Sequence, residues 1–409
     1  MNARNHKEYT LPGVDSMQAA LATQRQPTPL LLAPVGDKTV ELDFDGGRLS
    51  SDAGLILLKD IDDQLGLTRA LAAVLADSRD ARRIHFTPED ILKQRVFQIA
   101  AGYEDANDAH TLRHDPIFKL LLNRLPETGA PLASQPTLSR FENRVSRTEI
   151  YRMALVLMDQ FIASYNRPPE VIVLDVDDTE DRAHGAQEPI RYDGYYGGYC
   201  FMPLHLYEGL SGRLITAILK AKRFSGAHML AVLKRVVKRL RHAWPDTWVI
   251  WRGDRHFAYP EVMAWLEAQP HLSYVIGLTS NTVLQKLAQE VVEQAKRAYA
   301  RWGRKATRFH ATRSQAGTWS HSRRVVIKVE VSEQGVNTRF VVTDMEQART
   351  QVLYRHISCA RGQMENEIKD HKLYLKSDRT SCHRFEANQV RLFLHSAAYV
   401  LLDTLRREV

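Results

Sequence analysis

Two aspartates follow short apolar runs in this chain of 409 residues, where their carboxylates could do chemistry. Asp177 ends the β-branched run at residues 171–177, and Asp175 lies two residues earlier on the same face of the predicted strand. Asp254 directly follows a second run, at residues 248–252. In open α/β sheets, ligands gather outside the carboxyl ends of strands, so we expect a site there. Each aspartate alone is a weak signal, because an aspartate at a strand end more often caps a helix or forms a turn.

A third acid, Glu365, lies in the charged segment at residues 361–372, which is predicted to be helical. At about 100° per residue, Arg361, Glu365 and Lys372 project within roughly 40° of one another. One carboxylate is therefore flanked by two cations along a single stripe. A solvated helix face with ion pairs one turn apart is the alternative explanation.

Asp177, Asp254 and Glu365 together suit the binding of divalent metal ions, because Mg²⁺ prefers a few carboxylates with water and substrate phosphate. Two such ions a few Å apart can activate a water or a 3′-hydroxyl for in-line attack on a phosphodiester. Arg361 and Lys372 would then neutralise the scissile and neighbouring phosphates. The sequence contains no Walker-type loop, GxSxG elbow or HExxH motif that would support another chemistry.

The strands that would position Asp177 and Asp254 belong to a predicted α/β sheet. Strands are predicted at residues 171–177, 199–207, 214–219, 248–252 and 273–278. The amphipathic pattern of residues 225–244 predicts a helix after the third strand. Three strands, a helix and two further strands describe a ribonuclease-H-like mixed sheet, whose first part we place at residues 166–284.

A basic helix and a β-hairpin with its turn at Gly335 interrupt this core, so residues 285–348 are predicted to form a β-rich insertion. Arg301 and Arg304 lie in the basic segment and could hold polyanionic DNA, although a merely solvated basic helix fits equally well. Residues 349–409 are predicted to complete the core with C-terminal helices.

The N-terminal part divides into a polar arm at residues 1–30 and a mainly helical region at residues 31–165. In the helical region, residues 134–144 resemble the start of a recognition-type helix that carries Arg140 and Arg144. Helix N-termini and arginines suit phosphate contact. A capped surface helix is an equally good interpretation.

The composition favours a polyanionic partner such as nucleic acid, because the net charge is +8 and the basic residues are spread along the chain. Three cysteines with no CxxC pair fit a reducing cytosol and give no zinc site or disulfide framework. The chain lacks a signal-peptide pattern and any run approaching the ~18 apolar residues of a spanning helix. We therefore expect neither export nor membrane insertion.

Several other side chains near the predicted site could take part. His184 and His256 could assist proton transfer, but histidines in polar loops are more often structural. A loop of tyrosines interleaved with glycines could stack on unpaired bases, and a glycine-rich turn beside a strand is an equal alternative. The tyrosines of this loop are Tyr192, Tyr195, Tyr196 and Tyr199.

The three acid segments, in this order and with a β-rich insertion before the last, resemble the DDE transposases of bacterial insertion sequences. The spacings are 254 − 177 = 77 and 365 − 254 = 111 residues. In that family the third acid lies in the signature Y-(2)-R-(3)-E-(6)-K, which this sequence matches at Arg361, Glu365 and Lys372. The tyrosine position holds Ser358, with Tyr354 one helical turn earlier. The resemblance covers about residues 50–409.

The resemblance implies two Mg²⁺ ions per active site, with Mn²⁺ able to substitute, bound by Asp177, Asp254 and Glu365. It implies hydrolysis at the element ends and then attack of the freed 3′-hydroxyl on DNA, in relatives often through a hairpin. The implied partners are double-stranded DNA, as terminal inverted repeats and as target, and a second copy of the chain in a synaptic complex. The implied location is cytoplasmic and nucleoid-associated.

Asp177, in its D-x-T form, is preferred to Asp175 as the first ligand. Two other functions stay open at this point: a structure-selective nuclease on the same fold, and a DNA-binding repressor with an inactive site. The presence of acids at all three positions favours an active enzyme over the repressor.

Overall fold

The computed structural model describes residues 30–35, 38–42, 50–80, 82, 84–183, 185, 187, 189–193 and 197–408. The chain divides into two compact units, at residues 1–51 and 52–409. In the first unit, β1 (Leu30–Val35) pairs antiparallel with β2 (Lys38–Leu42). Apart from Leu30, the predicted polar arm lies outside the described residues.

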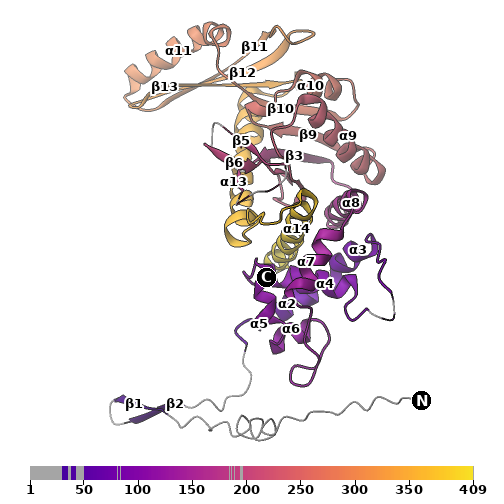
Figure 1. Ribbon diagram of the computed structural model, residues 1–409. Helices are drawn as coiled ribbons and strands as arrows, with labels where there is room; N and C mark the ends of the chain where they lie inside the picture. The colour runs from indigo at the N-terminus through magenta and orange to yellow at the C-terminus, as the bar shows by residue number, and fades with distance from the viewer. Residues whose placement is uncertain are drawn as a thin grey trace, which may run out of the picture. The chain divides into compact units, whose positions relative to one another are not determined.

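The second unit contains an eight-stranded mixed sheet in the order β11-β12-β13-β10-β9-β3-β7-β8 (Figure 1). Its central strands are β3 (Val171–Asp178), β7 (Leu204–Glu208), β8 (Leu214–Ile218), β9 (Trp248–Gly253) and β10 (Leu272–Leu278). β3, β9 and β10 are parallel, whereas β7 and β8 add antiparallel on the other side of β3. The five predicted core strands are present.

One predicted strand is divided. Residues 199–207 form β6 (Gly198–Phe201) and then β7, separated at Pro203, because proline has no N–H to donate to a strand ladder. β6 belongs to a small antiparallel sheet with β4 (Asp181–Arg182) and β5 (Arg191–Asp193). This small sheet follows directly on the carboxyl end of β3.

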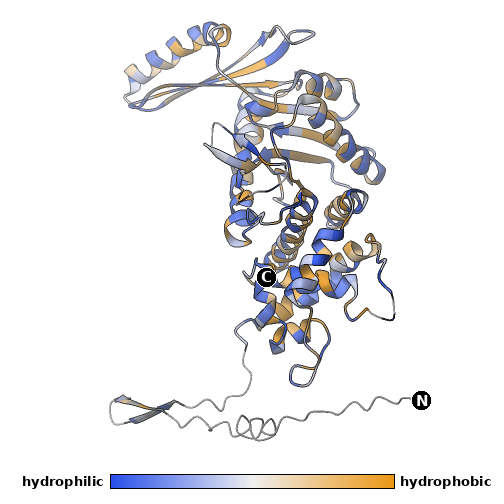
Figure 2. Cartoon of the chain, viewed as in Figure 1, coloured by the Kyte–Doolittle hydropathy of each residue, from blue (hydrophilic) through white to orange (hydrophobic). Residues whose placement is uncertain are grey.

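Three helices pack on one face of the main sheet: α9 (Gly226–Ala243), α10 (Pro260–Glu267) and α11 (Thr282–Trp302). α9 begins where the hydroxyl of Ser225 accepts the backbone N–H of His228, and its apolar residues at helical spacing are buried against the strands. Figure 2 shows hydrophobic residues along the strands and hydrophilic ones on the outer faces of α9 and α11. The helix at residues 225–244 was predicted, whereas α10 was not.

The predicted β-rich insertion is continuous with the main sheet. β11 (Ala306–Ser314), β12 (Arg323–Ser332) and β13 (Gly335–Thr343) form an antiparallel ladder, and β13 pairs with β10. The hairpin turn before Gly335 is confirmed, but β11 was not predicted. Because the backbone of β13 bonds along β10, these strands extend the core instead of forming a separate layer.

Helices make up the region between Leu55 and Ala163. They are α2 (Leu55–Leu65), α3 (Leu67–Ala73), α4 (Pro88–Ala100), α5 (Ala109–Leu112), α6 (Pro116–Leu121), α7 (Gln135–Arg144) and α8 (Arg147–Ala163). Their apolar side chains share one core with the last helix, α14 (Phe385–Glu408). The helical region therefore packs its apolar side chains against the last helix of the chain.

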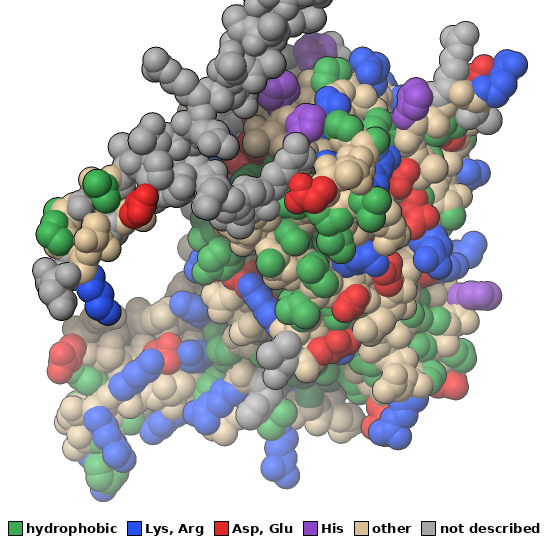
Figure 3. Space-filling model, turned by 90° about the horizontal axis from the view of Figure 1, so that it is seen from below, with side chains coloured by type: hydrophobic (Ala, Val, Ile, Leu, Met, Phe, Trp, Pro, Cys, Tyr) green, Lys and Arg blue, Asp and Glu red, His purple; other side chains and the backbone are tan. Residues whose placement is uncertain are grey.

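Surface charge is mixed in the view of Figure 3, where basic and acidic side chains alternate with hydrophobic ones over much of the face. The net charge of +8 therefore does not mark one obvious binding surface in that view. No helix in the described part of the chain is long and apolar enough to cross a membrane.

A buried ion triad links the helical region to the C-terminal helix. Glu142 on α7 is completely buried, and its two oxygens lie 3.0 Å from Nε of Arg95 on α4 and 2.8 Å from Nε of Arg391 on α14. A lone buried charge is far costlier than a paired one, so each member requires the others.

Replacing Glu142 with Gln is expected to lower the free energy of unfolding by about 3–5 kcal/mol, because two buried guanidinium groups lose their counter-charge. Urea unfolding followed by circular dichroism measures this loss. The matched control is Glu386→Gln, which removes a carboxylate paired at 2.9 Å with the exposed Arg147 and should cost less than about 1 kcal/mol. Equal losses in the two variants would contradict a structural role for the triad.

Candidate active site

Asp177 and Asp254 lie side by side at one edge of the main sheet. The parallel register of β3 and β9 pairs Val176 with Gly253; Asp177 is the next residue of β3, and Asp254 directly follows the end of β9. Gly253 permits this arrangement, because a Cβ there would lie 2.9 Å from that of Phe257 and 3.1 Å from the side chain of Val176. The chain can thus turn immediately after β9 and present Asp254 at the edge.

Asp177 is held between an arginine and other acids. Its Oδ2 lies 2.7 Å from Nη2 of Arg361, and its Oδ1 accepts the backbone N–H of Asp178 at 3.0 Å. Burial raises the pKa of Asp177 to about 7, and the nearby charges of Asp254 and Asp178 add to this rise although Arg361 opposes it. The negative charge at this edge is therefore only partly balanced by the protein.

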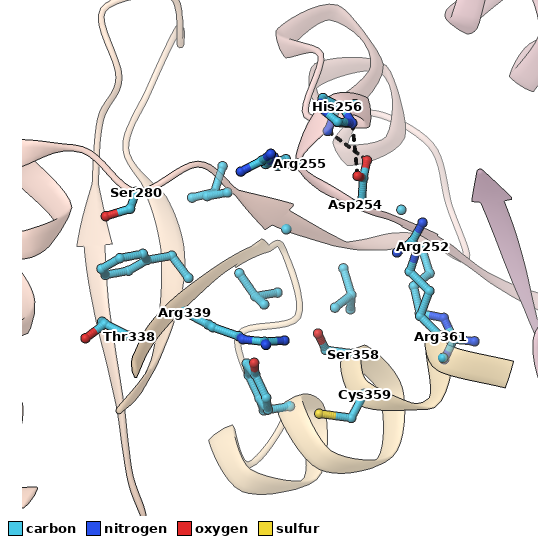
Figure 4. Close-up of a pocket in the computed structure, with 18 of the residues that line it drawn as sticks. Arg252, Asp254, Arg255, His256, Ser280, Thr338, Arg339, Ser358, Cys359 and Arg361 are labelled. Atoms are coloured by element: carbon cyan, nitrogen blue, oxygen red, sulfur yellow. Dashed lines mark hydrogen bonds and ion pairs between the residues drawn. The ribbon is translucent and has the colours of Figure 1, made fainter. Parts of the chain in front are cut away.

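Asp254 directly precedes a 3₁₀ turn, Arg255–Phe257, and caps it. Its Oδ1 accepts the backbone N–H of His256 at 2.8 Å, and its Oδ2 lies 3.0 Å from Nδ1 of the same residue (Figure 4). The capping role expected for an isolated aspartate is thus present together with exposure to the cavity. His256 holds both oxygens of the carboxylate in one orientation.

Glu365 lies on α13 (Gly362–Lys369) with its side chain exposed. Each pair of the three acids lines a common cavity. Asp177 and Asp254 line one of about 450 Å³, Asp254 and Glu365 one of about 700 Å³, and Asp177 and Glu365 one of about 370 Å³. The structure therefore brings the three predicted acids together around adjoining cavities, although they are widely separated in sequence.

The acids do not converge on one point. No group of three or more His, Cys, Asp or Glu side chains arranged to hold a metal ion occurs within the described residues. The donor set nevertheless fits a hard divalent cation, because Asp177 and Asp254 are carboxylates close enough for mutual repulsion to raise the pKa of Asp177.

The predicted regular helix at residues 361–372 is interrupted. A π-helical turn (Leu353–Ser358) and a 3₁₀ turn (Cys359–Arg361) precede α13, and a second π-helical turn (Asp370–Tyr374) follows it. Uniform rotation of 100° per residue therefore does not extend to Lys372. Its ammonium contacts the hydroxyl of Thr179 at 3.2 Å, beside the end of β3.

A family model described as "Transposase DDE domain group 1" matches residues 32–409. The chain belongs to the DDE transposase family. None of the curated proteins compared matches it. Among solved structures, "Cryo-EM structure of piggyBac transposase synaptic complex with hairpin DNA (SNHP)" is similar at a TM-score of 0.45 and 13% identity, over 90% of this chain and 77% of that one.

Two further acids at the edge of the transposase sheet are paired inside the protein. Asp175 is fully buried, and both of its oxygens accept the guanidinium of Arg252, which also donates to the carbonyl of Ile357. Asp178 lies 2.9 Å from the ammonium of the buried Lys220. These pairs explain why Asp175 and Asp178 need no outside cation. In the sequence, each of these pairs is indicated by its cation, since Arg252 lies within an apolar run and Lys220 follows one. The sequence analysis did not identify either pair.

The remaining predicted site residues of the transposase do not line the cavities that hold the acids. Arg140 is exposed on α7, whereas Arg144 lies 3.0 Å from Asp77. Arg301 and Arg304 are exposed at the end of α11. Tyr192 and Tyr199 are exposed cross-strand neighbours with ring centroids 5.6 Å apart, and His184, Tyr195 and Tyr196 lie outside the described residues.

Asp175→Asn is expected to destabilise the transposase by about 3–5 kcal/mol, because the buried Arg252 loses its counter-charge. Denaturant unfolding measures this effect. Asp159→Asn is the matched control, since Asp159 pairs with Arg239 at 2.6 Å on a partly exposed surface and its loss should cost less than about 1 kcal/mol. A small loss of unfolding free energy in Asp175→Asn would contradict this structural role and make Asp175 a candidate for the first metal ligand again.

Asp177→Asn is expected to stabilise the metal-free protein more at pH 8 than at pH 5. The folded pKa, about 7, lies above the usual value of 3.8, so ionisation penalises the folded state. This penalty is absent below about pH 4, grows as the pH rises and is complete above about pH 7. Unfolding free energies in EDTA at the two pH values test it. An effect of the substitution that is independent of pH would contradict the raised pKa.

Proposed function

We propose that this protein is a DNA transposase of the insertion-sequence type, which cuts and joins DNA strands with the triad Asp177, Asp254 and Glu365. The proposal rests on one observation: each pair of these three acids lines a shared cavity, and the three cavities adjoin one another at the carboxyl ends of parallel strands. Membership of the DDE transposase family supports the same assignment.

The proposed core is ribonuclease-H-like. In chain order the five central strands are β3, β7, β8, β9 and β10, and their order across the sheet is β10-β9-β3-β7-β8. The first three strands form an antiparallel meander, and the last two lie parallel to the first. This arrangement agrees with the fold that the sequence predicts and supports residues 166–284 as its first part.

Asp177, Asp254 and Glu365 would hold divalent ions, with Mg²⁺ as the proposed metal and Mn²⁺ as a substitute. Two bound ions would supply activation of a water or 3′-hydroxyl and stabilisation of the leaving oxygen. Glu365 is exposed, so its carboxylate is free to turn toward the two aspartates. His256, through its two contacts with Asp254, would keep that carboxylate directed into the cavity.

Arg361 and Lys372 would contact DNA phosphates beside the cut. Arg361 lines the cavity of about 700 Å³ that contains Asp254 and Glu365, and its charge partly balances the negative charge of Asp177. Lys372 lines the cavity that contains Asp177 and Glu365. Both cations are therefore within the same pocket system as the acids, where an approaching phosphate would meet them.

The helical region would bind the terminal inverted repeats, with Arg140 as an exposed candidate for phosphate contact. Arg144 has a protein partner, and any contact it makes with DNA would compete with Asp77. Arg301 and Arg304 would hold DNA beside the sheet extension, which consists of β11, β12 and β13. Strand transfer would take place in a synaptic complex of two copies of the chain bound to element ends and target.

Glu365→Gln is expected to lower cleavage at the element ends by at least about 100-fold while DNA binding is kept, because a direct ligand matters more than the groups that orient it. Labelled fragments from both sides of the gene are incubated with protein, with and without Mg²⁺, and nicked and joined products are measured. Asp370→Asn is the matched control, since its carboxylate pairs at 3.0 Å with the exposed Arg406 and lines none of the three cavities.

Metal-dependent nicking or joining at the boundary, lost only in Glu365→Gln, would establish the transposase. Binding to the ends without cleavage would indicate a DNA-binding protein with an inactive site. Cleavage that ignores the ends would indicate a nuclease on the same fold.

A further inference from the structure

The cavity of about 700 Å³ extends well beyond the acids that line it. One wall consists of β9, β10 and β13, and the other consists of the turns around Ser358 and Arg361 with α13 (Figure 4). Asp254 and Glu365 are its acidic lining residues, whereas four arginines line it. The cavity is therefore acidic at the metal-binding side and basic elsewhere.

The four arginines differ in their partners. Arg252 is paired with Asp175 and Arg361 with Asp177. Arg255 and Arg339 are exposed, and neither has a carboxylate partner in the described part of the chain. Two guanidinium groups without a counter-ion in one cavity favour an anionic ligand from outside.

Arg339 is directed into the cavity by its neighbours on the hairpin. It lies opposite Lys328 in the β12–β13 register, and like charges in this position repel. Lys328 is already engaged, because its ammonium lies 2.9 Å from Glu330 and 5.1 Å from the ring centre of Tyr354. Tyr354 and Arg339 both line the cavity, and the positive charge of Arg339 opposes the rise that burial causes in the pKa of the Tyr354 phenol. Figure 4 shows Arg339 extending from its strand toward Ser358 on the opposite wall.

Arg255 lies on the other side of the same cavity, directly after Asp254. Gly277 allows β10 to pass close to it, since a Cβ at that position would lie 3.1 Å from the backbone nitrogen of Arg255. The hydroxyls of Thr338 and Ser358 also line the cavity. Guanidinium groups and hydroxyls are the donors that commonly contact the phosphates and sugars of DNA.

We propose that Arg255 and Arg339 form a phosphate-binding subsite for the DNA strand next to the cut, on the strand side of the cavity. The inference rests on the proposed function, since it takes the substrate to be DNA. The acids would face the scissile phosphate, while Arg255 and Arg339 would bind phosphates farther along the same strand. In this way the sheet extension would contribute directly to the active site.

Methylphosphonate scanning tests this subsite, because each such linkage removes the charge of one phosphate. The probe is a fluorescein-labelled duplex taken from the gene-flanking fragment that the wild-type protein binds most tightly. Arg339→Ala is expected to weaken binding about tenfold, as for one charge-assisted hydrogen bond, and to lower the slope of log affinity against log salt by about 1. DNA binding by the Arg339→Ala variant should also become insensitive to one methylphosphonate linkage that weakens DNA binding by the wild-type protein. Arg255→Ala should lose sensitivity at a different linkage.

Arg308→Ala is the matched control, because Arg308 is exposed on β11, two strands from β13, and lines none of the three cavities that hold the acids. It should keep the wild-type methylphosphonate pattern. Arg339→Lys should retain the salt slope, and its melting temperature shows whether position 339 tolerates change. The inference is overturned if Arg339→Ala and Arg308→Ala give the same pattern and slope while the wild-type protein cuts the probe. If the wild-type protein neither binds nor cuts any flanking fragment, the proposed function fails and the subsite with it.

Discussion

Repulsion between carboxylates at the carboxyl edge of the main sheet is the constraint on which the site depends. Parallel pairing of β3 with β9 places Asp177 beside Asp254, and burial leaves these charges poorly solvated, as the raised pKa of Asp177 shows. The protein supplies one direct counter-charge to Asp177, from Arg361. A site of this kind gains stability from cations, which is the electrostatic requirement of a metal-dependent nuclease.

Neighbouring acids on β3 differ in the ion-pair partners that the fold provides. Asp175 and Asp177 lie on the same strand and differ by two positions, yet Arg252 engages both oxygens of Asp175. Asp178 is likewise engaged by Lys220. Asp177 lines two of the cavities that hold the acids, whereas Asp175 lines none of the three, and this difference gives a physical reason to prefer Asp177 over Asp175.

The position of the third acid depends on packing far from it. Glu365 is carried by α13, and Met364 and Ile368 of that helix are buried in the core that the helical region shares with α14. The Arg95–Glu142–Arg391 triad ties α14 to the same region. Changes in the helical region could thus alter the distance between Glu365 and the two aspartates, with no contact to DNA required.

The sequence by itself determined the central strands, α9, the hairpin at Gly335 and the three acid segments, because buried strands, amphipathic helices and turns leave local patterns of hydrophobicity. It also placed Asp177 and Asp254 at strand ends. The tertiary structure alone decided the pairing of Asp175 with Arg252, the joining of β13 to β10 and the packing of α14 among N-terminal helices. These features depend on contacts between residues distant in sequence, and a local pattern carries no information about the partner that a side chain or strand meets in space.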